Sequence, residues 1–372
     1  MERPGSSSTS AIGLAPRPAA SRASPSVRIS FSSPRPVRPA TTACLCLTLY
    51  ITFGPAARNF AVSRVSIQIR PPRSIPSRPA AFYTDTNNER GGYPMTRTNT
   101  AASPEEINAR LYKHTDIHPA LPGAGSVGKE DYEHYRSQGF IAVSGILDAE
   151  EVRLSSEEIM SIIFAAEPQA KVQFTRPQNE LRDNGERELA VRKVYEFVNG
   201  NERLREMAHH PRILAIVERI LGGKAKLVQD MALLKPPTGG GEKPWHQDMA
   251  YGPLAYHNAV VGVWIALDEA GLDNGCMHVI PRSQMSGAVP HYAVRDWQLC
   301  DEAVPVERDV AVPLAPGGAL FFHGLLFHGT PNNTSLKRRR ALQFHYALDT
   351  SAKLTPQEYK RMFTNELTGA EC

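Results

Sequence analysis

From residue 224 onward, apolar and polar residues alternate with a period of two in short segments that are separated by Gly, Pro and Asn turns. This period is typical of strands with one buried face, and no helical pattern interrupts the segments. Strands at this spacing predict an antiparallel sandwich or barrel of the jelly-roll type. The predicted strands span 226–235, 259–267, 277–280, 310–314, 319–322 and 340–348.

Helical patterns precede these strands and predict helices that cover a sheet. Asp148 is a typical N-cap residue, and Gly139 and Gly222 are typical of helix ends. We therefore expect an α+β fold, mainly β, in one domain over 101–372. The expected elements are a short helix from 104, a helix over 129–138, a strand over 140–143, a helix from 149, a long loop over 165–200 with a short strand or helix near 191–197, and a helix pair over 201–221 that is broken at Pro211.

Residues 1–100 differ in composition from the rest. The first 84 residues contain eleven Arg, no Lys and one acid, so they contribute +10 to a net charge of +4 and leave −6 for the remainder. A Ser-, Pro- and Arg-rich segment cannot bury enough apolar surface to fold, so we expect disorder. It fits a mitochondrial transit peptide, an untargeted tail of a cytoplasmic protein, or residues added by a misplaced start codon. The apolar run 43–53 is too short to span a bilayer, and the acidic remainder gives no argument for nucleic acid or an anionic membrane surface.

Five cysteines occur, at positions 44, 46, 276, 300 and 372, without CxxC pairs or zinc-ribbon spacing. This pattern predicts no disulfide framework and favours a reducing compartment. The C-terminal residues Ala370-Glu371-Cys372 also differ from the Ser-Lys-Leu type of peroxisomal address.

His246 and Asp248 stand two positions apart after a Gly/Pro-rich turn. Residues i and i+2 of a strand point to the same face, so both side chains can reach one metal ion. An open non-haem iron centre needs a second imidazole, for which His323, His328 and His345 are the candidates. His323 and His328 differ by five, so a regular strand would place them on opposite faces. The histidines at 209, 210, 257, 278 and 291 have ordinary explanations at helix ends, in loops or on strand faces.

Arg339 follows His328 by eleven residues, at the start of the last strand. His328 is followed by Gly329 and Thr330, small residues that let a ligand come close. A buried Arg is costly unless a carboxylate pairs with it, which gives a functional reason for one here. The alternative is that residues 337–340 form a solvated basic hairpin.

Strand parity predicts which side chains of the last strand face a cavity. Arg339, Ala341, Gln343 and His345 share one face, whereas Leu342 and its even-numbered neighbours share the other. If Arg339 points inward, the cavity wall there is polar and the apolar face packs outward under the helices. By the same rule, Trp264 shares a face with Gly262 and Ala266, and Met231 shares one with Gln229.

Five segments occur in a fixed order: His246-Gln247-Asp248, Trp264 within 263–267, Asn274-Gly275-Cys276, Ile280-Pro281-Arg282-Ser283, and His328-Gly329-Thr330 followed by Arg339. In this order and spacing they resemble the phytanoyl-CoA dioxygenase family over roughly 130–350. The resemblance implies an iron(II)- and 2-oxoglutarate-dependent oxygenase on a double-stranded β-helix, a cupin-like jelly roll. This chain departs from the family pattern at Gly317-Gly318, where Gly-Asp is frequent, and at Gln284, where His is frequent. Neither position is an implied ligand, so both bear on turn structure or substrate.

The resemblance also implies roles for individual residues, with Fe(II), 2-oxoglutarate and O2 as cofactor and co-substrates. It makes His246, Asp248 and His328 the iron ligands. It makes Arg339 the partner of the distal carboxylate of 2-oxoglutarate. Further implied contacts are Trp264 and Thr330 beside the co-substrate, Gln247 between the ligands, and Lys193 and Met231 as two additional co-substrate contacts.

Three classes of function fit these residues. The first is an oxygenase that hydroxylates or otherwise oxidises a small molecule, either a natural-product intermediate or, as in phytanoyl-CoA dioxygenases, an acyl-CoA. The second is a zinc metallohydrolase, because a His2Asp site also activates water. The third is a non-catalytic metabolite-binding protein. Arg339 argues against the hydrolase and the complete ligand set against the third class. The acidic domain lacks an obvious basic patch for coenzyme A, which favours a smaller, neutral or cationic substrate, and the oligomeric state is not indicated.

Overall fold

The computed structural model describes residues 102–165, 168–366, 368–369 and 371–372. The predicted leader over 1–100, with its transit-peptide hypothesis, lies outside the described residues. Within the described part of the chain, no helix is long and apolar enough to cross a membrane.

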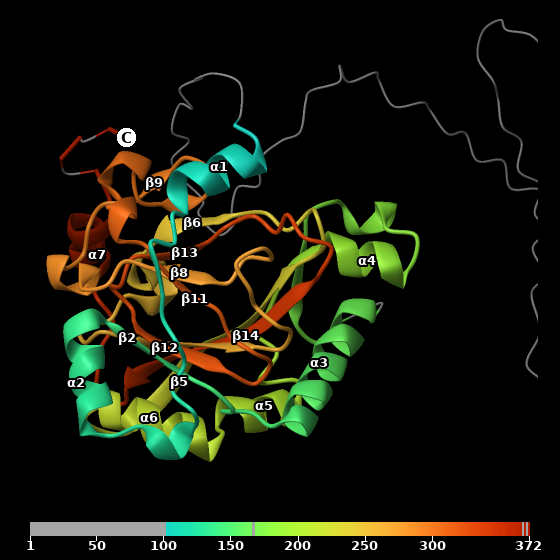
Figure 1. The fold of residues 1–372 in the computed structure, drawn as a ribbon, viewed down its shortest axis with the longest axis horizontal. Coiled ribbons are helices and arrows are strands. Elements are labelled where there is room, and N and C mark those ends of the chain that lie inside the picture. Colours follow the sequence, from blue (N-terminus) through green and yellow to red (C-terminus); the bar gives the residue numbers. More distant parts are fainter. Residues whose placement is uncertain (1–101, 166–167, 367, 370) are drawn as a thin grey trace, which may run out of the picture. The chain divides into compact units, whose positions relative to one another are not determined.

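Two mainly antiparallel sheets form the centre of the fold, as expected for a jelly roll (Figure 1). All six predicted strands are present, and the segment near 191 is a strand. The larger sheet has the order β2 (Phe140–Val143), β12 (Ala319–His323), β7 (Val261–Ala266), β14 (Arg339–Leu348), β5 (Ala225–Lys235), β4 (Val191–Tyr195) and β3 (Lys171–Phe174). The smaller sheet has the order β1 (Asp116–Ile117), β11 (Val310–Val312), β8 (Met277–Val279), β13 (His328–Thr330) and β6 (Lys243–His246), and β9 (Tyr292–Ala293) pairs separately with β10 (Trp297–Gln298).

The helices over residues 149–164 and 202–221 lie along one side of the larger sheet, and β6, β8, β11 and β13 lie on its other side, together with the helix over residues 104–111 (Figure 1). Asp148 accepts a hydrogen bond from the backbone of Glu151, as a helix N-cap should, and Gly139 and Gly222 end their helices in the left-handed conformation. The prediction of a long loop over 165–200 is wrong in part, because this segment contains β3 and a further helix. The helices are α1 (Pro104–Leu111), α2 (Lys129–Gln138), α3 (Ala149–Phe164), α4 (Asn184–Ala190), α5 (Glu202–Ala208), α6 (Pro211–Leu221) and α7 (Pro356–Phe363).

The two faces of β14 separate the two main apolar clusters, as strand parity predicts. Leu342, Phe344 and Tyr346 belong to the cluster between the larger sheet and the helices, and the Tyr346 hydroxyl donates to the Ala208 carbonyl at the end of α5 over 2.7 Å. Ala341 packs in the other cluster, between the sheets. The inner face of β14 is therefore the face that carries Arg339, Gln343 and His345.

The two departures from the family pattern have structural explanations. Gly317, which keeps the glycine of the family pattern, has φ +82°, and a Cβ there would lie 2.2 Å from the Leu147 carbonyl oxygen. At the departing position, Gly318, a Cβ would lie 3.0 Å from the Ala315 carbonyl oxygen, so the turn before β12 has little room for a side chain. The Gln284 amide donates to the carbonyls of Arg136 and Ser137 at the end of α2. Both positions thus serve the packing of the N-terminal elements.

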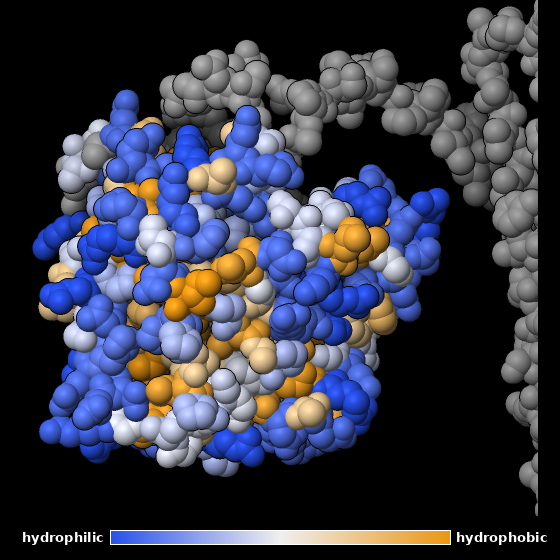
Figure 2. All heavy atoms as spheres, in the orientation of Figure 1, coloured by the Kyte–Doolittle hydropathy of each residue, from blue (hydrophilic) through white to orange (hydrophobic). Residues whose placement is uncertain are grey.

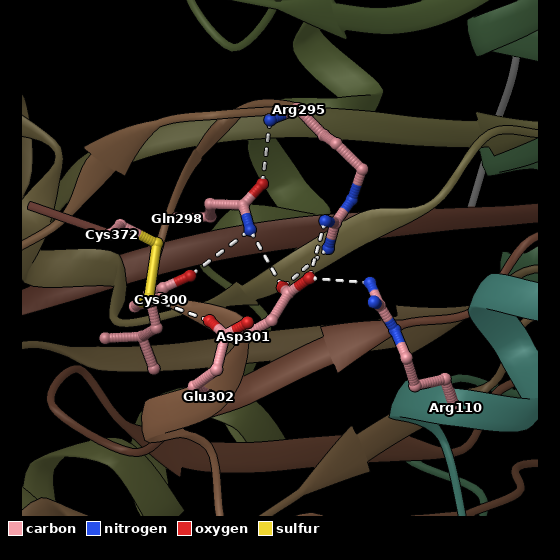
Figure 3. Close-up of a disulfide and its surroundings, with 8 residues drawn as sticks. Arg110, Arg295, Gln298, Cys300, Asp301, Glu302 and Cys372 are labelled. Atoms are coloured by element: carbon pink, nitrogen blue, oxygen red, sulfur yellow. Dashed lines mark hydrogen bonds and ion pairs between the residues drawn. A yellow bond between two sulfur atoms is a disulfide. The ribbon is translucent and has the colours of Figure 1, made fainter. Parts of the chain in front are cut away.

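One disulfide joins Cys300 to Cys372, two residues 72 positions apart (Figure 3). It ties the end of the chain to the turn after β10, where Asp301 forms ion pairs with Arg110 and Arg295. The cysteine spacing predicted no such pairing, and that expectation is wrong here because the partners meet only through the tertiary fold. Cys276 is buried and unpaired.

Candidate metal centre

His246, Asp248 and His328 meet between the sheets, each at most 4% exposed. One ligand atom from each side chain lies within 4.8 Å of those of the other two. His246 ends β6 and pairs directly with His328 at the start of β13. The expectation that Asp248 continues the same strand is wrong, because β6 ends at His246 and Asp248 opens the 3-10 turn Asp248–Ala250. A tight turn, rather than strand parity, brings the carboxylate to the imidazoles.

Backbone carbonyls orient both imidazoles. The Nδ1 atom of His246 lies 2.8 Å from the Pro244 carbonyl oxygen, and that of His328 lies 2.9 Å from the Leu326 carbonyl oxygen. Each Nδ1 therefore donates, which leaves the Nε2 lone pair free. Both Nε2 atoms lie 3.4 Å from the same oxygen, Oδ1 of Asp248. Two nitrogen donors and one oxygen donor thus face a common point.

The protonation states suit metal binding. Burial, together with the neighbouring His328 and Lys243, lowers the pKa of His246 to about 4. Burial by itself would raise the pKa of Asp248, but the imidazoles of His328 and His345 beside its carboxylate hold that pKa well below its usual range. At neutral pH the site offers a neutral imidazole at His246 and a carboxylate at Asp248, which are the forms that bind metal ions.

A buried cation, Arg339, lies on the same inner face of β14 as Gln343 and His345, both of which contact Asp248. Arg339 is 2% exposed, and its guanidinium stacks over the Trp264 ring at 5.3 Å and donates one hydrogen bond, to the Leu233 carbonyl. Among the described residues, no carboxylate forms an ion pair with it, and burial lowers the pKa of Arg339 to about 10. The alternative of a solvated basic hairpin is wrong for Arg339.

Three buried polar atoms of the predicted co-substrate contacts have no hydrogen-bond partner in the described part of the chain: Nε of Arg339, Nε1 of Trp264 and Oγ1 of Thr330. Unsatisfied buried donors beside an uncompensated cation are costly for the protein alone. They are the groups that a bound carboxylate would satisfy. The residues present therefore fit a dianionic co-substrate, and Thr330 lies two positions from His328 on the same strand.

Gln247 holds loops around the site, and its contact with a co-substrate remains a prediction. Its amide nitrogen donates to the carbonyls of Gly287 and Leu325, and its amide oxygen accepts from the Val289 backbone. Both ends of the side chain are thus used to hold loops around the site.

Lys193 and Met231 lie farther along the inner face of the larger sheet. Met231 pairs across the strands with Gln343 on one side and Tyr195 on the other. The ammonium of Lys193 lies 5.6 Å from the Tyr195 ring centroid. Their contact with a co-substrate remains a prediction.

The other histidine candidates have distinct environments. His323 ends β12, and a turn separates it from β13, so the prediction that compared both residues within one strand does not apply. His345 lies on β14 with its Nε2 atom 2.7 Å from Oδ2 of Asp248. His345 therefore contacts a member of the cluster without belonging to it.

A charged group that the sequence did not indicate lies next to His246. Lys243 and Arg192 both donate to Oδ2 of Asp296 over 2.8 Å, and the Lys243 ammonium contacts the Tyr251 hydroxyl. The Tyr251 ring packs edge-on against His246, with the ring centroids 5.6 Å apart. Burial lowers the pKa of Lys243. These contacts link β4, β6 and the β9–β10 connection beside the site.

The sequence model of the family described as "Phytanoyl-CoA dioxygenase (PhyH)" matches residues 135–341, more than half of the chain. The chain belongs to this family. It is therefore a non-haem iron, 2-oxoglutarate-dependent dioxygenase, with Fe(II) as cofactor and 2-oxoglutarate and O2 as co-substrates.

Individual relatives agree with this assignment. The chain is 25% identical over 274 residues to phytanoyl-CoA dioxygenase domain-containing protein 1 of Danio rerio, and the match covers 62% of this chain and 93% of that protein. It is 24% identical over 235 residues to the peroxisomal phytanoyl-CoA dioxygenase of Homo sapiens, covering 59% of this chain and 68% of that protein.

Solved structures share the fold. EvdO2 from Micromonospora carbonacea var. aurantiaca, crystallised with 2-oxoglutarate, is 25% identical with a TM-score of 0.52, over 64% of this chain and 99% of that chain. EctD from S. alaskensis is 18% identical with a TM-score of 0.50, over 66% of this chain and 84% of that chain. At that identity, EctD supports the fold alone.

Proposed function

We propose that this oxygenase hydroxylates a small molecule, with His246, Asp248 and His328 as its iron ligands. The observation that carries the proposal is the buried cluster of these three donors, together with the buried Arg339 on the inner face of β14, which has no ion-pair partner among the described residues. Two imidazoles and one carboxylate are the donor set of open non-haem iron sites. A zinc hydrolase would have no use for the buried guanidinium.

Arg339 binds the distal carboxylate of 2-oxoglutarate in this proposal. A planar guanidinium suits bidentate pairing with a carboxylate, and burial strengthens the charge interaction. The Trp264 indole and the Thr330 hydroxyl supply the nearby hydrogen-bond donors that lack partners in the protein alone. The co-substrate thereby compensates a charge that would otherwise destabilise the inner face of β14.

When bound, Fe(II) and 2-oxoglutarate would supply the chemistry that activates O2 for oxidation of the substrate. The chain contributes position and environment. Carbonyls of Pro244 and Leu326 fix the two imidazole rings, so their lone pairs need no reorientation when the metal binds. Phe322, whose ring centroid lies 4.6 Å from that of His328, belongs to the apolar cluster between the sheets and keeps water from this side of the site.

The proposed substrate is a natural-product intermediate without a large anionic group. The described domain follows an Arg-rich leader and is itself acidic, so it offers no broad basic surface for the phosphates of coenzyme A. Beside the site, Lys243 and Arg192 are already paired with Asp296. On the face shown in Figure 2, hydrophobic residues gather in separate patches among hydrophilic ones.

An acyl-CoA hydroxylase is the second candidate, since several relatives carry the name phytanoyl-CoA dioxygenase.

The two candidates separate in one assay. The protein with Fe(II), 2-oxoglutarate and O2 is incubated with an acyl-CoA panel and, separately, with a small-metabolite extract from a strain in which the gene is deleted. Succinate formation and a product heavier by one oxygen are measured by mass spectrometry. We expect both in the extract and not with the acyl-CoA panel. Turnover of acyl-CoA alone would overturn the proposed substrate class, and no succinate with either would overturn the hydroxylase proposal.

A further inference from the structure

The two oxygens of the Asp248 carboxylate have different partners. Oδ1 faces Nε2 of His246 and Nε2 of His328, at 3.4 Å from each. Oδ2 lies 2.7 Å from Nε2 of His345 and 3.4 Å from the amide nitrogen of Gln343. The carboxylate therefore divides its contacts between the ligand imidazoles on one side and β14 on the other.

We propose that His345 is a positioning residue that fixes the Asp248 carboxylate with Oδ1 alone turned toward the metal. This inference rests on the proposed iron ligands. Because Asp248 is ionised, its oxygen accepts and the Nε2 atom of His345 donates. The hydrogen bond thus occupies Oδ2 and opposes rotation of the carboxylate to a geometry in which both oxygens face the metal.

The side chain of His345 is buried within the larger sheet's inner face. It is 1% exposed and lies on β14 opposite Gly262 of β7. A Cβ at Gly262 would lie 2.4 Å from the Phe322 ring, so that ring fills the space over the glycine. His345 therefore reaches Asp248 from a buried position on a strand that carries none of the proposed ligands.

The proposed histidine ligands and Asp248 are oriented by different kinds of hydrogen-bond partner. Backbone carbonyls hold His246 and His328 at their Nδ1 atoms. Asp248 follows the end of β6 in a short 3-10 turn, so it lacks the support that strand pairing gives the two histidines. A side chain from β14 supplies that support instead.

One ring nitrogen of His345, Nδ1, has no hydrogen-bond partner among the described residues. With Nε2 donating to Asp248, its Nδ1 is left as an acceptor, and that atom is buried without a hydrogen-bond partner among the described residues. A buried unsatisfied nitrogen destabilises the fold. An imidazole that served only to fill space would be replaced without loss by an apolar ring, which is the basis of the test.

The test uses Co(II), whose d–d bands report coordination geometry and which is stable in air. The variants are His345→Phe, which removes the donor, and His345→Gln, which keeps an N–H donor at similar reach. Loss of an outer hydrogen-bond partner typically weakens metal binding about 10–100-fold. We expect that loss and altered d–d bands for His345→Phe, and recovery of most of the affinity for His345→Gln.

His278→Phe is the matched control, because His278 is also buried and paired with a carboxylate, Asp309, and its side chain packs against Tyr112 and His114 rather than against a proposed ligand. It should leave Co(II) affinity unchanged. Unaltered affinity and bands in His345→Phe would overturn the inference and leave the iron ligands standing. Equal weakening in His345→Phe and His345→Gln, with a loss of metal-free thermal stability like that of His278→Phe, would show a structural role and also overturn it. Absence of Co(II) and Fe(II) binding by the unmodified protein would overturn the ligand assignment itself.

Discussion

Two buried histidine–carboxylate pairs lie in this fold, Asp248 with His345 and Asp309 with His278. In the second pair both carboxylate oxygens lie 2.9 Å from Nδ1 of His278, and one of them also accepts the His114 backbone amide over 2.8 Å. All four side chains in the two pairs are nearly inaccessible to solvent.

The difference between the pairs lies in what else faces the carboxylate. Asp309 is satisfied by one imidazole and one backbone amide, which ties the segment after α1 to β8 and β11. Asp248 keeps an oxygen directed at two more imidazoles, whose Nε2 lone pairs are free. A buried His–Asp pair is therefore a structural unit by itself, and it becomes part of a metal centre only when further unprotonated donors converge on it.

The largest expected effect comes from removing each carboxylate in turn. Asp248→Asn should abolish Fe(II) binding and reduce turnover to background, because the site loses its anionic donor. Asp309→Asn should retain Fe(II) binding but lower the free energy of unfolding by about 1–3 kcal/mol, the cost of a broken buried hydrogen bond. Iron titration and urea unfolding of both variants measure these outcomes. Iron binding lost in Asp309→Asn, or kept in Asp248→Asn, would erase the distinction between the pairs.

A second difference between the regions is the buried cation Arg339, which shares the inner face of β14 with His345 and forms no ion pair among the described residues. Arg339→Met should weaken 2-oxoglutarate binding about tenfold to hundredfold, because a hydrogen bond to a charged group contributes about 1.5–3 kcal/mol. Iron affinity should stay nearly unchanged, and the thermal midpoint of the ligand-free protein should rise because a buried unpaired charge is removed. Calorimetric titration and thermal unfolding test this. Parallel loss of iron and 2-oxoglutarate binding would give Arg339 a structural role instead.

A smaller effect is expected at Thr330, whose hydroxyl has no partner in the described part of the chain. Thr330→Val keeps the shape and removes the donor, so the KM for 2-oxoglutarate should rise about two- to tenfold, as for one neutral hydrogen bond of about 0.5–1.5 kcal/mol. The free energy of unfolding should not fall. A KM equal to that of the unmodified protein would mean that the hydroxyl does not contact the co-substrate.

His323 allows a comparison with both pairs, since it is a largely buried imidazole that pairs with no carboxylate among the described residues. Burial lowers its pKa from 6.5 to about 4. Between these values the unfolded chain binds a proton that the folded protein does not, so this residue makes stability fall as the pH drops from about 6.5 toward 4. In His323→Phe, urea unfolding across this range should show a shallower decline. An unchanged slope would mean that the imidazole takes up its proton in the folded state.

Much of the fold follows from the sequence because long strands and capped helices carry local patterns. β5 and β14 show the period of two over ten or more residues, and Asp148 and Gly139 mark helix ends. The strands that carry the proposed ligands, β6 and β13, are only four and three residues long, which is too short for a periodic pattern. The C-terminal helix α7 was also missed, although the capping box of Thr355 and Glu358 marks its start.

The candidate site, like the fold, could be predicted from the sequence only in part. The spacing of His246 and Asp248 and the inward face of Arg339 could be predicted, although a 3-10 turn rather than a strand positions Asp248. The contact of His345 with Asp248 joins residues 97 positions apart, and the disulfide of Cys300 joins residues 72 positions apart. Neither pairing has a local pattern, because each depends on how separate strands and loops pack together.

Anaerobic titration of the unmodified protein with Fe(II) in the presence of 2-oxoglutarate tests the central claim most directly. The account predicts binding of one iron per chain together with a visible metal-to-ligand charge-transfer band that appears only when both are present. It further predicts that Asp248→Asn removes the band. Absence of the band at saturating Fe(II) and 2-oxoglutarate, or its persistence in Asp248→Asn, would contradict the account.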